Sequence, residues 1–211
     1  MPHCPAIGNH FFHETSVPFR ASSMVVKSLL FLLLALAAPA PVRAGEMAAV
    51  DEVAARLAPA TTERVKATVL IFLAHDCPVS NVLVPEMNRI ATEYGPRGVA
   101  FFFVYAERDL TDVDAARHAQ EFALAAPAAV DRAGALVARA GARVTPEAAV
   151  FSPAGEVMYR GRINDLFAAP GKKRAVPTTH DLRDALDAVL AGKAPPAATT
   201  PAVGCFIATK P

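Results

Sequence analysis

The feature that most constrains the fold is the stretch Lys66–Ser80, in which an apolar segment runs directly into a cysteine. Ala67–Ala74 is a continuous apolar run, which is typical of a strand buried on both faces. In the following Ser80–Tyr94 the apolar residues recur at steps of three and four, which predicts a helix. Cys77 therefore lies at the start of that helix, where unpaired backbone N–H groups favour the thiolate. Because the thiolate is the nucleophile of thiol chemistry, this placement indicates a redox function for Cys77 rather than a role in packing alone.

The rest of the chain predicts a single α/β domain in which strands alternate with helices. Helical spacing is found in Met47–Leu57, Asp112–Phe122 with Thr111 as its cap, Gly134–Ala140, and Thr179–Leu190 with Thr179 as its cap. Further strands are predicted at Val99–Tyr105, Ala128–Val130, Ala148–Phe151 and Val157–Arg160, the last two as a hairpin. This order predicts a sheet with helices on both faces.

The N-terminal part carries the pattern of a signal peptide. From Met24 a basic residue, a short apolar core and small residues lead to a predicted cut after Ala44. Residues 1–23 fit no part of this pattern and are interpreted as a non-native upstream extension, which places the true start at Met24 and removes Cys4 from the mature chain. A membrane-spanning helix needs about 20 apolar residues, and the apolar core of this signal pattern is shorter. We therefore expect no stable membrane span after cleavage, with an uncleaved membrane anchor as the alternative. The expected location is periplasmic or secreted, where disulfides persist.

Several motifs together resemble the thioredoxin-like superfamily, in particular exported redoxins of the alkyl hydroperoxide reductase/thiol-specific antioxidant, or peroxiredoxin-like, type. The resemblance covers roughly residues 60–192 and is carried by Cys77-Pro-Val-Ser80, Pro85, Val144-Thr145-Pro146, Gly155 and Gly161. It implies a thioredoxin-like α/β fold with a central mixed β-sheet flanked by helices on both faces. It also implies that Thr145 and Pro146 form a cis-proline loop that faces Cys77 and binds substrate, and that no organic cofactor is needed.

The chain departs from this family pattern at the positions that matter for mechanism. Ser80 replaces the second cysteine of the usual Cys-x-x-Cys pair, so exchange within that motif is impossible. Ala74 stands where peroxiredoxins place the threonine or serine that orients the peroxide. The chain contains no tryptophan, whereas thioredoxins usually carry one just before their motif.

A second cysteine, Cys205, lies in a Pro/Ala-rich tail predicted at residues 193–211, beyond the thioredoxin-like domain at 45–192. The segment from Ala194 to Cys205 can extend about 36 Å at about 3.3 Å per residue, enough to cross the face of the domain. The hypothesis is that Cys205 resolves an oxidised or mixed-disulfide Cys77. The alternatives are a permanent staple between the two cysteines, an intermolecular bridge, or a Cys77 kept for packing.

The resulting functional expectation is an exported thiol-based oxidoreductase with catalytic Cys77 and Cys205. Its expected partners are a peroxide or a thiol/disulfide protein as substrate, and a reductant that the sequence does not identify. The balanced net charge of +1 gives no indication of nucleic acid. Two alternatives stay open: a non-catalytic thioredoxin-like binding module, and a copper- or metal-handling protein using His75, Cys77, His180 and Cys205, although no metal is assigned. Glu147 is expected to face solvent.

Overall fold

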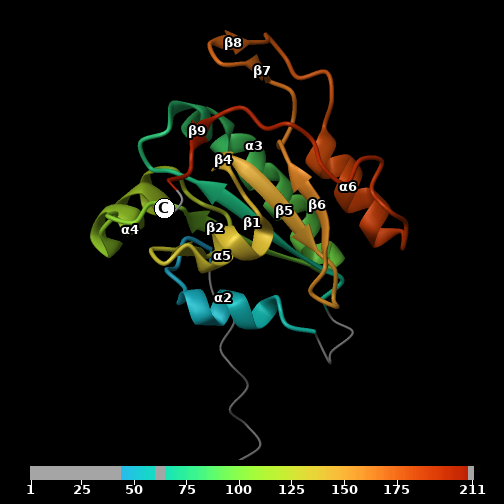
Figure 1. The fold of residues 1–211 in the computed structure, drawn as a ribbon, viewed down its shortest axis with the longest axis horizontal. Helices are drawn as coiled ribbons and strands as arrows, with labels where there is room; N and C mark the ends of the chain where they lie inside the picture. The colour runs from blue at the N-terminus through green and yellow to red at the C-terminus, as the bar shows by residue number, and fades with distance from the viewer. Residues whose placement is uncertain (1–43, 60–64, 209–211) are drawn as a thin grey trace, which may run out of the picture. The chain divides into compact units, whose positions relative to one another are not determined.

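The centre of the sheet is β1 (Ala67–Leu73), whose seven residues are all buried. The computed structural model describes residues 44–59 and 65–208. On one side of β1 lies the parallel strand β2 (Val99–Tyr105), and on the other the antiparallel strand β5 (Glu147–Phe151). β3 (Ala128–Val130) and β6 (Val157–Gly161) complete the order β3-β2-β1-β5-β6 (Figure 1). The predicted apolar run is therefore the central strand of a mixed sheet.

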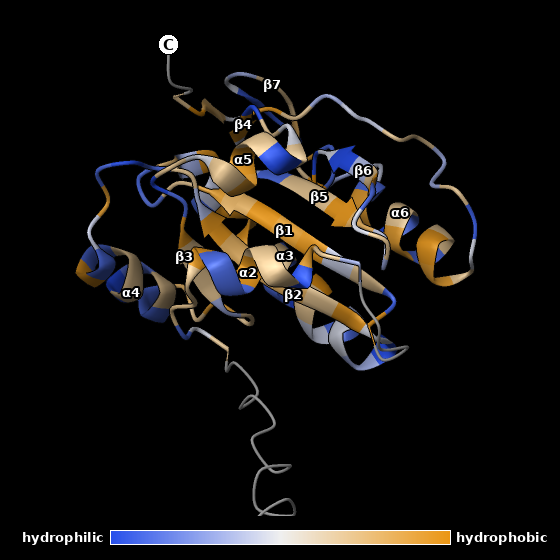
Figure 2. Cartoon of the chain, turned by 60° about the horizontal axis from the view of Figure 1, so that its bottom comes forward, coloured by the Kyte–Doolittle hydropathy of each residue, from blue (hydrophilic) through white to orange (hydrophobic). Residues whose placement is uncertain are grey.

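Helices cover both faces of this sheet. The helices within the described residues are α2 (Val50–Arg56), α3 (Pro78–Tyr94), α4 (Asp112–Glu121), α5 (Ala135–Ala140) and α6 (Asp181–Leu190), with a 3-10 turn, η1, at Gly95–Arg97. Alternate side chains of β1 enter two separate apolar clusters, because successive residues of a strand point to opposite faces. Ile71 packs in the cluster that contains α3, α4 and α6, whereas Phe72 packs with α2 and α5. Figure 2 shows the strands β1 and β2 as largely apolar, and the helices packed on both faces of the sheet confirm the predicted α/β architecture.

The predicted element boundaries hold with small shifts at the helix starts. Thr111 caps α4 as expected, since its hydroxyl accepts a hydrogen bond from the backbone N–H of Asp114 at 3.1 Å. Thr179 does not cap α6, which begins at Asp181 with His180 as its N-cap residue. The Thr179 hydroxyl instead donates to the Asp181 carboxylate at 2.7 Å.

The C-terminal segment is more ordered than the predicted tail. β9 (Cys205–Phe206) pairs antiparallel with β4 (Val144–Thr145), and Thr199 forms an isolated parallel bridge with Arg160 of β6. The segment therefore runs along the domain and is held at two places (Figure 1). A small exposed hairpin, β7 (Phe167–Ala169) with β8 (Lys172–Lys173), forms before α6.

The predicted upstream extension and signal peptide, residues 1–23 and 24–44, lie outside the described residues except for Ala44. Within the described ranges, no helix has the length and apolar character required to cross a membrane.

Candidate functional site

Cys77 is the N-cap residue of α3, directly after the two-residue turn that ends β1. Pro78 follows in the first helical turn, a position where its missing N–H does no harm. The Cys77 side chain is completely buried, and its thiol donates a hydrogen bond to the Thr145 carbonyl oxygen at 3.2 Å. The loop before Pro146 therefore lies against the sulfur, and the Thr145–Pro146 peptide bond is cis.

The pairing of β4 with β9 brings the second cysteine to the same place. Cys205 lies opposite Thr145 in the ladder, and its Sγ is 2.6 Å from Cys77 Sγ. Both cysteines are free thiols in this structure. Two sulfurs that are 128 residues apart in sequence thus face each other with no other residue between them.

A glycine makes this close approach possible. Gly204 packs so closely on β4 that a Cβ at this position would overlap the Thr145 carbonyl oxygen and come within 3.1 Å of the Pro146 nitrogen. Both neighbours are backbone atoms, which cannot rotate away as a side chain end can. Glycine is found where two backbones must approach this closely.

A second anchor holds the segment upstream of Cys205. The Thr200 hydroxyl lies 2.6 Å from the Tyr159 hydroxyl and accepts a hydrogen bond from the Arg162 backbone N–H at 3.2 Å. The Arg160 N–H donates to the Ala198 carbonyl, and the Thr200 N–H donates to the Arg160 carbonyl. These contacts hold the segment along β6, so that Cys205 is guided toward Cys77.

The surroundings make the two thiols unequal. Burial raises the pKa of the Cys77 thiol, but hydrogen bonds from the Cys205 thiol and from the Ser80 backbone and hydroxyl outweigh burial and lower it below the usual value. Burial, followed by the hydrogen bond and the charge of Cys77, raises the pKa of Cys205 to about 11. Asp76 and Glu107 add to this increase. Cys77 is therefore the more acidic thiol of the pair, and Cys205 the less acidic one.

Ser80, which replaces the usual second cysteine, lies buried one turn into α3. Its Oγ has no hydrogen-bond partner of ordinary geometry among the described residues. Its hydroxyl is close enough to the Cys77 sulfur to lower that thiol's pKa, although the Ser80 backbone N–H has the larger effect. The side chain therefore supports the Cys77 thiolate instead of reacting with it.

A buried hydrogen-bond network supports the turn before Cys77. His118 of α4 places Nδ1 2.8 Å from the Tyr105 hydroxyl and Nε2 3.0 Å from Asn81 Oδ1. The Asn81 amide in turn donates to the His75 carbonyl at 3.0 Å. Burial, followed by the charge of His75, lowers the pKa of His118. Because the Asn81 amide oxygen can only accept, Nε2 donates in the bond to it. Helix α4 is thereby tied to the start of α3.

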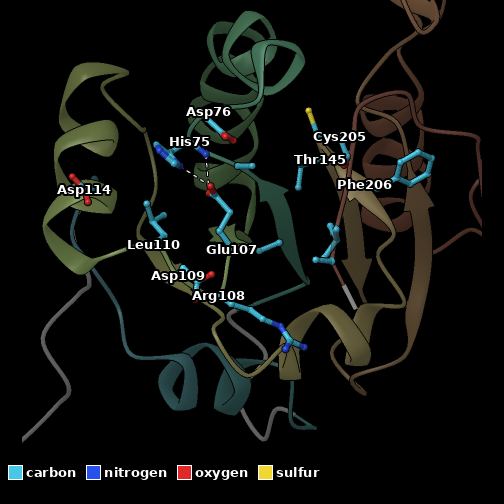
Figure 3. A pocket seen from close by; sticks show the side chains of 14 residues that line it. His75, Asp76, Glu107, Arg108, Asp109, Leu110, Asp114, Thr145, Cys205 and Phe206 are labelled. Atoms are coloured by element: carbon cyan, nitrogen blue, oxygen red, sulfur yellow. Dashed lines mark hydrogen bonds and ion pairs between the residues drawn. The ribbon is translucent and has the colours of Figure 1, made fainter. Parts of the chain in front are cut away.

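A cavity of about 470 Å³ opens beside the Cys205 sulfur and is lined by Cys205 and Thr145 (Figure 3). Its ionisable lining residues are the acids Asp76, Glu107, Asp109 and Asp114, together with Arg108 and His75. His75 lies against Glu107, with its Nδ1 2.6 Å from Glu107 Oε1 and its backbone N–H donating to the same carboxylate at 2.8 Å. The wall next to Cys205 is therefore mainly acidic.

The structure brings together the four residues proposed from the sequence, namely Cys77, Cys205, Thr145 and Pro146. It does not bring together the metal set that includes His180. The only grouping of at least three potential metal ligands within the described residues is His75, Asp76 and Glu107, whose ligand atoms lie within 4.8 Å of one another.

The expectation that Glu147 faces solvent is wrong. The side chain is buried, accepts a hydrogen bond from the Arg143 N–H at 2.7 Å and lies 3.6 Å from the Arg160 guanidinium. It thereby shapes the turn that leads into β4. Gly204, Thr200 and Glu107 were not predicted as site residues. Of the three, only Gly204 had a local indication in the sequence, because it directly precedes Cys205.

Comparison with known proteins shows which protein family the sequence matches. The sequence pattern of the Redoxin family matches residues 39–166. An uncharacterized conserved protein from Geobacillus kaustophilus is 27% identical, with a TM-score of 0.60 over 69% of this chain and 78% of that one. A hypothetical protein from Sinorhizobium meliloti 1021 is 25% identical, with a TM-score of 0.60 over 68% and 80% of the two chains.

A secreted disulfide oxidoreductase from Mycobacterium tuberculosis is a weaker structural match, with 20% identity, a TM-score of 0.39 and coverage of 60% of this chain and 81% of that one. The search of curated proteins returned no match. Because the family pattern covers more than half of the chain, the protein belongs to the Redoxin family, with a thioredoxin-like α/β fold.

Proposed function

We propose that the protein is an exported thiol–disulfide oxidoreductase whose redox centre is the pair Cys77 and Cys205. The observation that carries the proposal is the 2.6 Å separation of the two sulfurs, one in an environment that favours the thiolate and the other in one that favours the thiol. A thiolate beside a protonated partner is the arrangement that thiol–disulfide exchange requires. Membership of the Redoxin family supports the same chemistry.

In the proposed reaction Cys77 is the attacking thiol and Cys205 the resolving thiol. The Cys77 thiolate attacks one sulfur of a substrate disulfide, whose other sulfur leaves as a thiolate. Cys205 then loses its proton and attacks Cys77 Sγ in the mixed disulfide, which releases the second substrate thiol. The substrate gains two electrons, and the protein keeps a Cys77–Cys205 disulfide. Thr145 and Pro146 lie beside Cys77 and would hold the substrate segment after β9 has separated from β4.

We propose a disulfide rather than a peroxide as the acceptor. Ala74 carries no polar group with which to orient a peroxide. Export through the predicted signal peptide at residues 24–44 would place the pair where disulfides form and persist. A non-catalytic binding module is the rival function, and it predicts two inert thiols.

The test uses the full chain and three single variants: Cys77→Ser, Cys205→Ser and, as the matched control, Cys4→Ser. After treatment with an aromatic disulfide reagent, peptide mass mapping should find a Cys77–Cys205 bond in the wild type and in Cys4→Ser. Cys205→Ser should instead retain a stable mixed disulfide on Cys77, because the resolving thiol is missing. If both thiols of the treated wild type still alkylate freely, the binding module is the correct function.

A further inference from the structure

The two sulfurs of the redox pair are not equally accessible. Cys77 is completely buried beneath Thr145 and the β9 segment, whereas Cys205 is partly exposed and lies on the wall of the 470 Å³ cavity. Once the pair is oxidised, an external thiol in that cavity therefore meets Cys205 first. What points to a ligand is this reactive sulfur on a cavity wall, with room beside it for a small molecule or for one residue of a peptide.

The charges around Cys205 favour one class of thiol. Asp76 and Glu107 are close enough to act electrostatically on the Cys205 sulfur. Neither Asp76 nor Asp109 has a hydrogen-bond or ion-pair partner among the described residues that line this cavity. Arg108, the one lining arginine or lysine, extends away from Cys205 in Figure 3 and also lines a neighbouring cavity of about 440 Å³ beside α5.

We propose that the oxidised Cys77–Cys205 pair is re-reduced by a thiol that carries an adjacent positive charge and attacks Cys205 Sγ from this acidic cavity. The inference rests on the proposed function, because it requires that the disulfide forms. It adds the chemical class of the reductant and the sulfur that the reductant attacks. A cysteine flanked by lysine or arginine, or a small aminothiol, has the required chemistry.

The exchange is balanced in two steps. The external thiolate attacks Cys205 Sγ, a mixed disulfide forms there, and Cys77 leaves as a thiolate. A second external thiolate, or the second thiol of a dithiol, then attacks the external sulfur of the mixed disulfide. The reductant leaves as a disulfide, and Cys205 takes up a proton from solvent. Two thiols are oxidised and one protein disulfide is reduced.

Leaving-group chemistry favours the same direction of attack. In thiol–disulfide exchange the sulfur that is more stable as a thiolate leaves faster. Hydrogen bonds from Ser80 stabilise the Cys77 thiolate, whereas Asp76 and Glu107 disfavour negative charge on Cys205. Attack at Cys205 therefore expels the better leaving group.

The acidic wall repels a bare thiolate and attracts an ammonium or guanidinium group carried beside it. If two uncompensated carboxylates are taken to act at about 8 Å in water, Coulomb's law changes the local concentration of a reagent about five-fold for each unit of its charge. Reagents that differ by two charge units should therefore differ about 30-fold in rate at low ionic strength, and much less at high salt.

The test measures reduction of the oxidised full chain by three small thiols of similar size: cysteamine, 2-mercaptoethanol and mercaptoacetate. Rate constants are expressed per thiolate and corrected for thiol basicity. We expect cysteamine to be fastest and mercaptoacetate slowest, with a spread of about 30-fold that decreases in salt. Acid quenching followed by mass mapping should find the cysteamine adduct on Cys205.

Two variants complete the experiment. The double variant Asp76→Asn with Asp109→Asn should reduce the spread to a few-fold, whereas Asp184→Asn on α6, outside the cavity, should leave it unchanged. Equal rates for the three thiols, the reverse order, or an adduct on Cys77 would overturn the inference while leaving the proposed function intact. If no Cys77–Cys205 disulfide forms in the starting protein, it is the proposed function that fails.

Discussion

Replacing Gly204 by alanine should uncover Cys77 without unfolding the domain. The added Cβ would overlap the Thr145 carbonyl oxygen, and Gly204 has no room to shift because its close neighbours are backbone atoms. The β9 strand must then separate from β4. Of residues 204–207, only the partly buried Ile207 packs against an apolar cluster, so the two-sided core around β1 should stay largely intact.

The size of the effect follows from the contacts that hold β9. These are the two-residue ladder with β4, the Ile207 N–H to Arg143 carbonyl bond at 3.0 Å, and the long contact between the Thr145 hydroxyl and the Cys205 carbonyl at 3.5 Å. If about three hydrogen bonds each contribute about 1 kcal/mol net, the wild-type segment is open in roughly one molecule in 150. Separation in the variant should therefore speed alkylation of Cys77 by about 100-fold.

The assay is iodoacetamide labelling of the reduced full chain at fixed pH, with each cysteine quantified by peptide mass mapping. Gly95→Ala is the matched control, because a Cβ at that position meets no atom within 4 Å. Circular dichroism and thermal melting report whether the core has changed. A Cys77 labelling rate within three-fold of wild type, in a folded Gly204→Ala protein, would refute the view that the β9 segment covers Cys77.

Two further substitutions test the remaining parts of the site. Ser80→Ala should raise the pKa of Cys77, because the hydroxyl that helps to lower this pKa is lost. The ultraviolet thiolate absorbance of the reduced protein should then appear at higher pH than in wild type. Thermal stability should not change, because the Ser80 hydroxyl has no ordinary hydrogen-bond partner to lose. An unchanged titration would show that the serine hydroxyl does not act on the sulfur. Tyr159→Phe removes the hydroxyl that holds Thr200, and the loss of about 1 kcal/mol should make amide hydrogen exchange at Thr200 and Cys205 about five-fold faster. The control is Tyr94→Phe, which removes a hydroxyl whose partners, Arg183, Asp187 and Arg97, all lie outside the C-terminal segment. Equal exchange in the two variants would contradict the role given to this anchor.

Local patterns are sufficient to predict the central strand and the position of Cys77. β1 is a continuous apolar run, and α3 has its own periodic spacing, so the cysteine between them is placed by two neighbouring signals. The resemblance to the thioredoxin-like superfamily then supplied the loop at Thr145 and Pro146. These parts of the site lie on, or next to, elements with a strong local signal.

The position of Cys205 could be suggested but not located from the sequence. A two-residue strand has no measurable periodicity, and the pairing of residues 205 and 145 depends on contacts made far along the chain. The burial of Glu147 has the same origin, because its partner Arg160 comes from β6. Gly204 was the only local indication that the segment meets another backbone closely.

The separation of the two sulfurs along the chain has a consequence for folding itself. A bond between Cys77 and Cys205 closes a loop of 128 residues, and a loop of this size lowers the entropy of the unfolded chain by the equivalent of about 5 kcal/mol. Each turnover would therefore switch the protein between a more stable closed chain and a less stable open one. By linkage, the same free energy would make the two thiols easier to oxidise in the folded protein than in the unfolded chain. The oxidised protein would therefore melt at a higher temperature than the reduced protein.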